Sequence, residues 1–190
     1  MFLKVFLATK NSHKIQEIES IFSSISEDIE IYYDDNFSDV EETEETLEGN
    51  ALLKAMKGYE YAGIPTVADD TGLFVEALGG KPGVKSKRYY SEDATDAENI
   101  NYLLSRLGGS TNRHADFKTV VCFFDGQDSI FKEGILKGEI SFSPEGANGF
   151  GYDSIFLYKQ RTLAEMNEEE KNAISHRQIA FTKIAKTIKL

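Results

Sequence analysis

The stretch Val67-Ala68-Asp69-Asp70-Thr71-Gly72-Leu73 places two adjacent carboxylates directly after a short apolar run, Ile64–Ala68. The run is typical of a buried strand, and ligands of α/β proteins usually bind beyond the carboxyl ends of the strands. Adjacent residues on a strand point to opposite faces of the sheet, so we expect Asp69 and Asp70 to have different roles. Two neighbouring acids repel each other, and a hard cation such as Mg²⁺ would relieve that repulsion. The same residues also form good turns, so this stretch alone supports a metal site and a plain turn about equally.

Length and composition predict one ordinary domain, or one domain with two lobes, because 190 residues with 41% hydrophobic content can bury a substantial core. The sequence has no run of about 18 apolar residues, so we expect no membrane span. The apolar run Phe2–Ala8 is too short for a signal peptide and is expected to be the first strand. The single cysteine, Cys122, excludes an internal disulfide, which suits a cytoplasmic protein.

The net charge of −11 argues against a nucleic-acid polymer as the main partner. It leaves room for a nucleotide, because a small anion needs only a local positive pocket. Eight of the 32 acids lie between Asp34 and Glu48, where there is no Lys or Arg. Such a block is usually a solvated loop, although part of it could form a cation site facing Asp70.

A polar loop follows the first predicted strand, and we call residues 9–14 the phosphate loop. Apolar residues at helical spacing predict a helix from near His13. The backbone N–H groups and the dipole at the start of a helix favour an anion, and Thr9, Asn11 and Lys14 add a hydroxyl, an amide and a charge there. The segment has no Walker motif, and an ordinary helix capped by Asn11 or Ser12 is the commoner explanation of such a segment taken alone.

Hydrophobic periodicity predicts an alternation of helices and strands in the rest of the chain. Asn50 and Lys54 lie four residues apart on one predicted helix, so they share a face that meets either the phosphate loop or water. Asp125-Gly126 is a hairpin signal and gives the predicted sheet an antiparallel part. The expected helices cover 47–59, 96–107 and the residues after Ser175, and the expected strands cover 29–33, 73–78, 115–124 and 129–140.

Two stretches near the end of the chain are candidates for binding a base. Two glycines surround Phe150, so its ring could form a plate on which a base stacks, and Asp153 could accept from ring N–H groups. A tight turn with an inward-facing ring is the commoner arrangement. A capping box that begins at Ser175 sets His176 and Arg177 in the first turn of the last helix. Cations are poorly placed there, and such a local conflict often marks a functional site.

Four stretches together resemble the inosine triphosphate pyrophosphatase family, which removes non-standard purine nucleoside triphosphates. The resemblance extends over nearly the whole chain, and it rests on the order and spacing of motifs that are individually weak. Lys10 stands where the family commonly has Gly, and Thr71 stands where many bacterial members have Ser. The four stretches are Ala8–Lys14, Ala68–Leu73, Gly149–Asp153 and Ile174–Arg177.

This resemblance implies an α/β fold with an elongated central mixed β-sheet, flanked by helices and divided into two lobes with a cleft between them. It implies one such domain over residues 1–190 and a homodimer, and the cysteine usage noted above gives the expectation of a cytoplasmic location. It also implies a Mg²⁺-dependent reaction in which water splits ITP, dITP or XTP between the α and β phosphates. The products are the nucleoside monophosphate and pyrophosphate, and neither a membrane nor a nucleic-acid polymer takes part.

The resemblance also implies the site residues. Asp70 would bind the metal and activate water, and Glu41 would be the second metal acid, with Glu42 as the alternative. Lys14 and Lys54 would stabilise the charge that develops on the leaving pyrophosphate. The phosphates would contact Thr9, Lys10, Asn11, Ser12, His13 and Lys14, the substrate would also touch Thr71, and the base would be held by Phe150, Gly151, Tyr152, Asp153, Lys171, His176 and Arg177.

Two other functions stay open at this point. A pyrophosphatase of the related Maf type would act on pyrimidine or modified nucleotides, but the Ser-His-Arg and Phe-Gly-Tyr-Asp stretches argue against it. A non-catalytic nucleotide sensor would need the phosphate loop and the base pocket but not the acids. The presence of Asp69, Asp70 and Glu41 therefore favours an enzyme.

Overall fold

The computed structural model describes residues 3–25 and 28–188, and these divide into two compact units. The first unit comprises the chain up to Asp70, Thr119–Gly134 and the chain from His176 onward. The second unit comprises Thr71–Lys118 and Ile135–Ser175. The single two-lobed domain over residues 1–190, and the cleft between its lobes, stay predictions.

The strands form one mixed sheet, as predicted. Their order is β2-β1-β3-β5-β6-β7-β8, and β4 pairs with β3 outside this path. Strand β1 is parallel to both β2 and β3, whereas the β3/β4, β6/β7 and β7/β8 pairs are antiparallel. The strands are β1 (Leu3–Leu7), β2 (Ile29–Tyr32), β3 (Thr66–Val75), β4 (Lys81–Gly83), β5 (His114–Phe124), β6 (Ser129–Ile140), β7 (Phe156–Tyr158) and β8 (Arg161–Thr162).

The predicted helices are confirmed, and several carry the caps that their sequences indicate. Thr95 caps α3 in a capping box with Glu98, and Asn167 caps α4 in the same way. Gly63 ends α2 in the left-handed conformation that glycine adopts without strain. No described helix combines the length and the hydrophobicity that a membrane span needs. The helices are α1 (Ser12–Ile25), α2 (Leu47–Ala62), α3 (Asp96–Leu107), α4 (Glu168–Asn172) and α5 (His176–Ile188).

Strand β3 differs from the prediction. We expected a strand over Ile64–Ala68, a break at the two aspartates and a second strand over 73–78. Instead β3 runs without interruption from Thr66 to Val75, and Glu76–Leu78 is a 3₁₀ turn. The strand has neighbours on both sides in the sheet, and their backbone hydrogen bonds outweigh the turn preference of Asp-Asp-Thr-Gly. The plain-turn interpretation of this stretch is therefore wrong.

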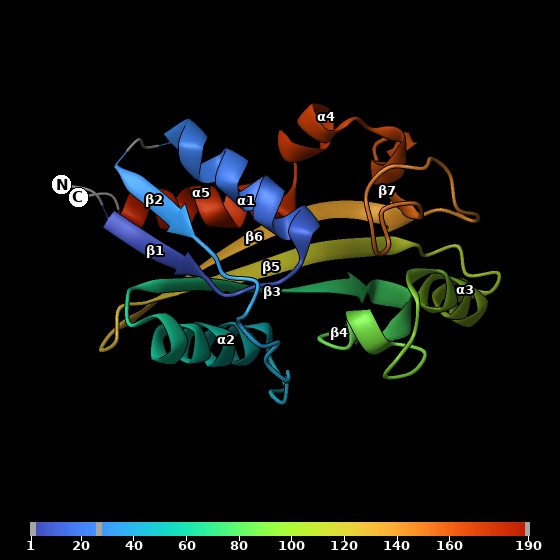
Figure 1. The fold of residues 1–190 in the computed structure, drawn as a ribbon. Helices are drawn as coiled ribbons and strands as arrows, with labels where there is room; N and C mark the ends of the chain where they lie inside the picture. Colours follow the sequence, from blue (N-terminus) through green and yellow to red (C-terminus); the bar gives the residue numbers. More distant parts are fainter. Residues whose placement is uncertain (1–2, 26–27, 189–190) are drawn as a thin grey trace. The chain divides into compact units, whose positions relative to one another are not determined.

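In the first unit, helices cover both faces of the strands (Figure 1). Val5, Leu7 and Val67 face one core, which α1 and α5 complete with large apolar side chains such as Phe181. On the opposite face, α2 approaches closely at Gly58, where an added Cβ would lie 2.6 Å from Thr66 Cγ2 and 2.8 Å from Ala8 Cβ. Alternation along the first half of β3, residues 66–70, therefore sends odd-numbered side chains toward α1 and α5 and even-numbered ones toward α2.

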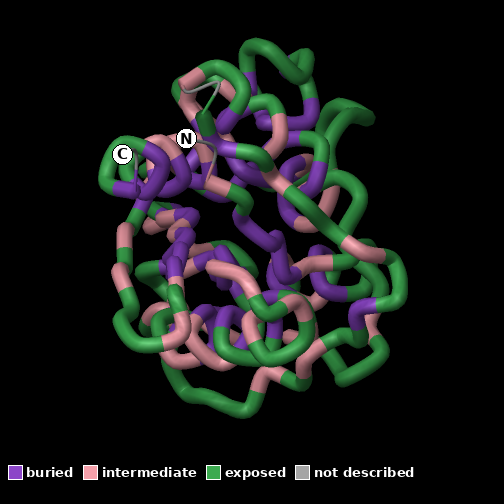
Figure 2. The backbone as a smooth tube through the Cα atoms, turned by 60° about the vertical axis from the view of Figure 1, so that its left-hand side comes forward, coloured by how far each residue is buried: buried purple, intermediate pink, exposed green. Residues whose placement is uncertain are grey.

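The second unit has its own core, built from β3, β5, β6, α3 and the segment that leads to α4. Leu73, Leu103 and Phe156 are fully buried in it. Figure 2 shows buried stretches of the chain enclosed by exposed loops and helix faces.

The predicted hairpin between β5 and β6 is also present, and its turn belongs to the first unit. Asp125 Oδ1 accepts from the N–H groups of Gln127 and Asp128 in this turn.

Candidate functional site

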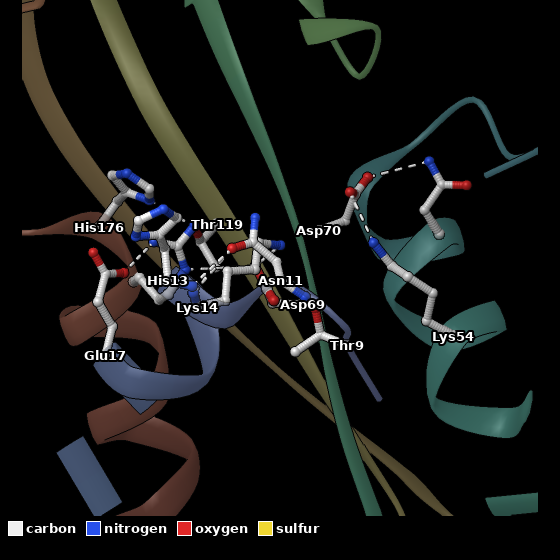
Figure 3. Close-up of polar contacts among 12 residues, drawn as sticks. Thr9, Asn11, His13, Lys14, Glu17, Lys54, Asp69, Asp70, Thr119 and His176 are labelled. Carbon is white, nitrogen blue, oxygen red and sulfur yellow. Dashed lines mark hydrogen bonds and ion pairs between the residues drawn. The ribbon is translucent and has the colours of Figure 1, made fainter. Parts of the chain in front are cut away.

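Strand β3 brings Asp69 and Asp70 to opposite faces of the sheet, as predicted. Both side chains are buried, with 1% and 6% of their surface exposed. Figure 3 shows Asp70 directed toward Lys54 on α2, while Asp69 lies with Lys14 on the α1 side. The two neighbouring carboxylates therefore have separate sets of partners.

Asp70 is held by two side chains of α2. Lys54 Nζ lies 3.1 Å from Asp70 Oδ1, and Asn50 Nδ2 donates to Asp70 Oδ2 at 3.1 Å. The face of α2 that carries Asn50 and Lys54 thus contacts Asp70 rather than water. Asn50 Oδ1 also accepts from the backbone N–H of Glu44 at 2.9 Å, so this amide ties the acidic loop to the same place.

The acid that shares a cation with Asp70 is Glu42. Lys54 Nζ lies 2.8 Å from Glu42 Oε1, so a single ammonium joins two carboxylates. Glu41 instead lines a pocket of about 430 Å³, together with Phe37 and Tyr61. Of the two alternatives for a second metal acid, the geometry favours Glu42 over Glu41, and metal binding by either stays a prediction.

Burial and charge act together on this group. Burial raises the pKa of the Asp70 carboxyl although the Lys54 ammonium acts in the opposite direction, and the Glu42 carboxylate adds to the rise. The pKa of Lys54 is raised as well: burial opposes the rise, but Asp70 and Glu42 outweigh it. Lys54 therefore stays a cation between the two carboxyl groups.

Asp69 belongs to a buried cluster of four charges. Lys14 Nζ lies 2.8 Å from Asp69 Oδ2, and Arg177 Nε lies 3.7 Å from the same oxygen. Arg177 also forms an ion pair with Glu17, one turn after Lys14 on α1. Burial alone would raise the pKa of Asp69, but the cations of Lys14 and Arg177 outweigh it and hold this pKa well below its usual range.

The phosphate loop forms the predicted strand-to-helix junction. Asn11 Oδ1 accepts from the backbone N–H groups of His13 (3.0 Å) and Lys14 (3.2 Å), so Asn11 is the cap of α1. Thr9 Oγ1 accepts from the N–H of Asn11 at 3.2 Å. Lys10, Ser12 and His13 are exposed at the same end of the helix. The junction has the donors that an anion needs, and phosphate binding stays a prediction.

His176 and Arg177 begin α5 and are both buried in the first unit. His176 Nδ1 lies 2.6 Å from Thr119 Oγ1 in β5. The guanidinium of Arg177 is held between Glu17 and Asp69, and these acids offset its poor position at the start of a helix.

In the second unit, Phe150 lies in a loop between two glycines, and stacking of a base on its ring stays a prediction. Gly149 and Gly151 both adopt positive φ, and an added Cβ at Gly149 would collide with the Asp153 carboxylate. Asp153 Oδ2 accepts from the backbone N–H of Phe150 at 2.9 Å and from Lys171 Nζ at 2.8 Å. Lys171 Nζ also lies 4.8 Å from the centre of the Phe150 ring. Asp153 therefore fixes the loop and Lys171 together.

Two other predicted residues of this unit have different surroundings. Tyr152 is buried and its hydroxyl donates to the backbone carbonyl of Ser86 at 2.8 Å, so its side chain is part of the core. Thr71 is half-buried in β3. Phe150, Gly151 and Asp153 line a pocket of about 330 Å³ with Asp96, which accepts from the Gly151 N–H at 2.6 Å.

Sequence reasoning missed three functional candidates: Glu17, Glu42 as the first choice, and Thr119. Glu17 follows Lys14 by three residues on a helix, and this spacing could have shown that they share a face. The choice between Glu41 and Glu42 depends on the path of the acidic loop, which Asn50 fixes. Thr119 gave no signal, because a threonine within an apolar strand is unremarkable.

A model of the Ham1 family matches residues 5–187 of this chain. The chain is 45% identical to a dITP/XTP pyrophosphatase of Elusimicrobium minutum, covering 98% of this chain and all of the relative. It is 43% identical to a dITP/XTP pyrophosphatase of a Thermoanaerobacter species, covering 96% and 94% of the two chains. A solved HAM1 protein from Coxiella burnetii has a similar fold, with a TM-score of 0.89, 37% identity and 98% of each chain covered.

Proposed function

The chain belongs to the Ham1 family, and we propose that it hydrolyses non-standard purine nucleoside triphosphates (ITP, dITP and XTP) to the monophosphate and pyrophosphate. The names of its full-length relatives support this reaction. The family match also removes the support for a pyrophosphatase of the Maf type. The observation that carries the proposal is the group formed by Asp70, Lys54 and Glu42, because a nucleotide sensor would not need paired carboxylates around one buried cation.

We propose that Asp70 and Glu42 hold Mg²⁺ in the loaded enzyme. The described residues contain no group of three or more His, Cys, Asp or Glu placed to hold a metal ion. Mg²⁺ usually takes one or two carboxylates from the protein and its other ligands from phosphates and water, so two acids fit it. When bound, the ion neutralises phosphate charge and makes water more acidic.

The side chains of the site supply binding and proton transfer. Lys14 and Lys54 are ammonium groups that can donate to phosphate oxygens, whereas the N–H groups of His13 and Lys14 at the start of α1 already donate to Asn11. The oxygen of water attacks the α-phosphorus, and the bond from that phosphorus to the bridging oxygen breaks, so pyrophosphate leaves. Asp70 accepts the proton of the attacking water as the general base.

Selectivity is proposed to come from hydrogen-bond donors that face position six of the purine. Hypoxanthine and xanthine have a carbonyl there, whereas adenine has an amino group. Lys171, His176 and Arg177 are all able to donate, and Phe150 offers a ring for stacking. A buried donor facing another donor costs about 1–3 kcal/mol, which is roughly tenfold to hundredfold against adenine.

The test is a substrate panel. We expect the wild-type chain with Mg²⁺ to release pyrophosphate from ITP, dITP and XTP and much less from ATP. Release from GTP should also be low, although guanine shares the carbonyl at position six, because the site has to reject its two-amino group. Release of orthophosphate would move the cut to another bond and overturn the mechanism. Tight nucleotide binding without turnover would support the sensor instead. The homodimer is a further proposal from the family resemblance, and light scattering of the purified protein tests it. The cytoplasmic location is a further proposal from the single cysteine.

A further inference from the structure

Thr119 of β5 directly contacts the ring of His176, which is one of the proposed base-binding residues. The hydroxyl Oγ1 lies 2.6 Å from the ring nitrogen Nδ1, and the two residues are 0% and 4% exposed. Figure 3 shows His176 beside Thr119 at the α1 and α5 side of the sheet. Water therefore has little access to this hydrogen bond.

The backbone of His176 is also held in place, by close packing against Gly134 of β6. Gly134 of β6 lies so close that an added Cβ would collide with the His176 carbonyl oxygen and would lie 2.7 Å from the backbone nitrogen of Ala180. The start of α5 thus rests directly on the strand. With both the backbone and Nδ1 fixed, the position of the other ring nitrogen, Nε2, is determined as well.

The charges nearby favour a neutral ring. Lys14 and Arg177 are two cations, and Asp69 and Glu17 are two anions, so the cluster is balanced without any charge on His176. A protonated imidazole next to Arg177 would add a buried positive charge to this balance. A neutral imidazole has one donor nitrogen and one acceptor nitrogen.

We propose that Thr119 is a positioning residue for base selection: its hydroxyl donates to His176 Nδ1, so that the proton of the ring stays on Nε2. A ring in this tautomer donates from Nε2, which suits a purine with a carbonyl at position six and disfavours the amino group of adenine. This inference rests on the proposed function, because it explains how His176 becomes a hydrogen-bond donor toward the base.

The first test reads the tautomer without any substrate. Protein with ¹⁵N-labelled histidine is measured by long-range ¹H–¹⁵N correlation at pH 7.5, and His176 is assigned by replacing His13 and His114 in turn. We expect the proton on Nε2 and an unprotonated Nδ1. A proton on Nδ1, whether alone or on both nitrogens, would overturn the proposal.

The second test measures selectivity in Thr119→Val, which keeps the shape and loses the hydroxyl. We expect the ratio of kcat/KM for dITP over dATP to fall roughly tenfold to hundredfold, and Thr119→Ser to restore it. Thr66→Val is the matched control, because Thr66 is another fully buried strand threonine, with its hydroxyl on the carbonyl of Ile64. The control should keep the wild-type ratio.

The outcomes separate the two proposals. An unchanged ratio in Thr119→Val, or an equal fall in Thr66→Val, would overturn the role of Thr119. A wild-type chain that turns over neither dITP nor XTP would overturn the proposed function, and the tautomer measurement would still report on Thr119 and His176. If Thr119→Val does not fold, the tautomer seen in the wild-type spectrum still decides whether the proposal stands.

Discussion

Asp69 and Asp70 are adjacent in the chain, yet each is bound by a lysine from a different helix. Lys14 of α1 pairs with Asp69, and Lys54 of α2 pairs with Asp70. The partners differ because a strand alternates its side chains between two faces. Their pKa values also move in opposite directions, lowered for Asp69 by its two cations and raised for Asp70 by burial. These differences support a structural role for Asp69 and a catalytic role for Asp70.

Replacement of Asp70 by Asn tests its catalytic role. The amide keeps the shape but cannot accept the proton of water, so we expect kcat to fall about 100- to 10,000-fold. Nucleotide binding, measured by calorimetry with dITP, should be partly retained because Lys14 and the phosphate loop are unchanged. A variant with the wild-type rate would show that Asp70 is not the catalytic base.

Replacement of Asp69 by Asn tests its structural role. The change leaves Lys14 and Arg177 with Glu17 as the remaining acid of the cluster, and breaking a buried ion pair typically costs about 3–5 kcal/mol of unfolding free energy. Chemical denaturation should show this loss. The control is Lys57→Ala, because Lys57 and Glu60 form an exposed pair and surface ion pairs contribute little to stability. Equal losses in both variants would contradict the assignment.

The elements differ in how far their sequences determine them. Helix α3 was predictable because Thr95 and Glu98 form a local capping box and its apolar residues repeat at helical spacing. Strand β3 was predicted only in part, because its neighbours in the sheet are remote in sequence and no local pattern reports them. For the same reason the residue types of the site could be predicted, whereas the choice of Glu42 and the contact of Thr119 with His176 could not.

Helix α2 offers a test of how closely it must approach the sheet. Alanine usually stabilises a helix relative to glycine, but a Cβ at Gly58 would lie 2.6 Å from Thr66 Cγ2. We expect Gly58→Ala to lose about 1–3 kcal/mol of unfolding free energy through overpacking. Met56→Ala, at an exposed position of the same helix, is the control. A Gly58→Ala variant as stable as wild type would show that α2 is free to move outward.

The whole chain carries a net charge of −11, although its proposed substrate is also an anion. Binding must therefore rely on local cations, and Lys14, Lys54 and Arg177 are all mostly buried beside acids. Since the Lys54 ammonium already lies between Asp70 and Glu42 and offsets one of their two negative charges, we expect the fold to persist without a metal ion.

Removal of metal follows from this charge arrangement. We expect EDTA to abolish turnover of dITP, because without the ion the phosphate charge is no longer neutralised. Added Mg²⁺ should restore turnover. The thermal unfolding midpoint should stay within about 2 °C, since a shift of about 1 kcal/mol would already move it by that much. Unfolding on chelation, or full activity without metal, would contradict the proposed role of the ion.

The most direct measurement of the proposed reaction is hydrolysis of dITP in ¹⁸O-labelled water, with both products analysed by mass spectrometry. Attack on the α-phosphorus predicts one ¹⁸O in the monophosphate and none in the pyrophosphate. Label in the pyrophosphate would mean attack on the β-phosphorus, and labelled orthophosphate would mean cleavage of the terminal phosphate. Either result would contradict attack of water on the α-phosphorus with Asp70 as the base.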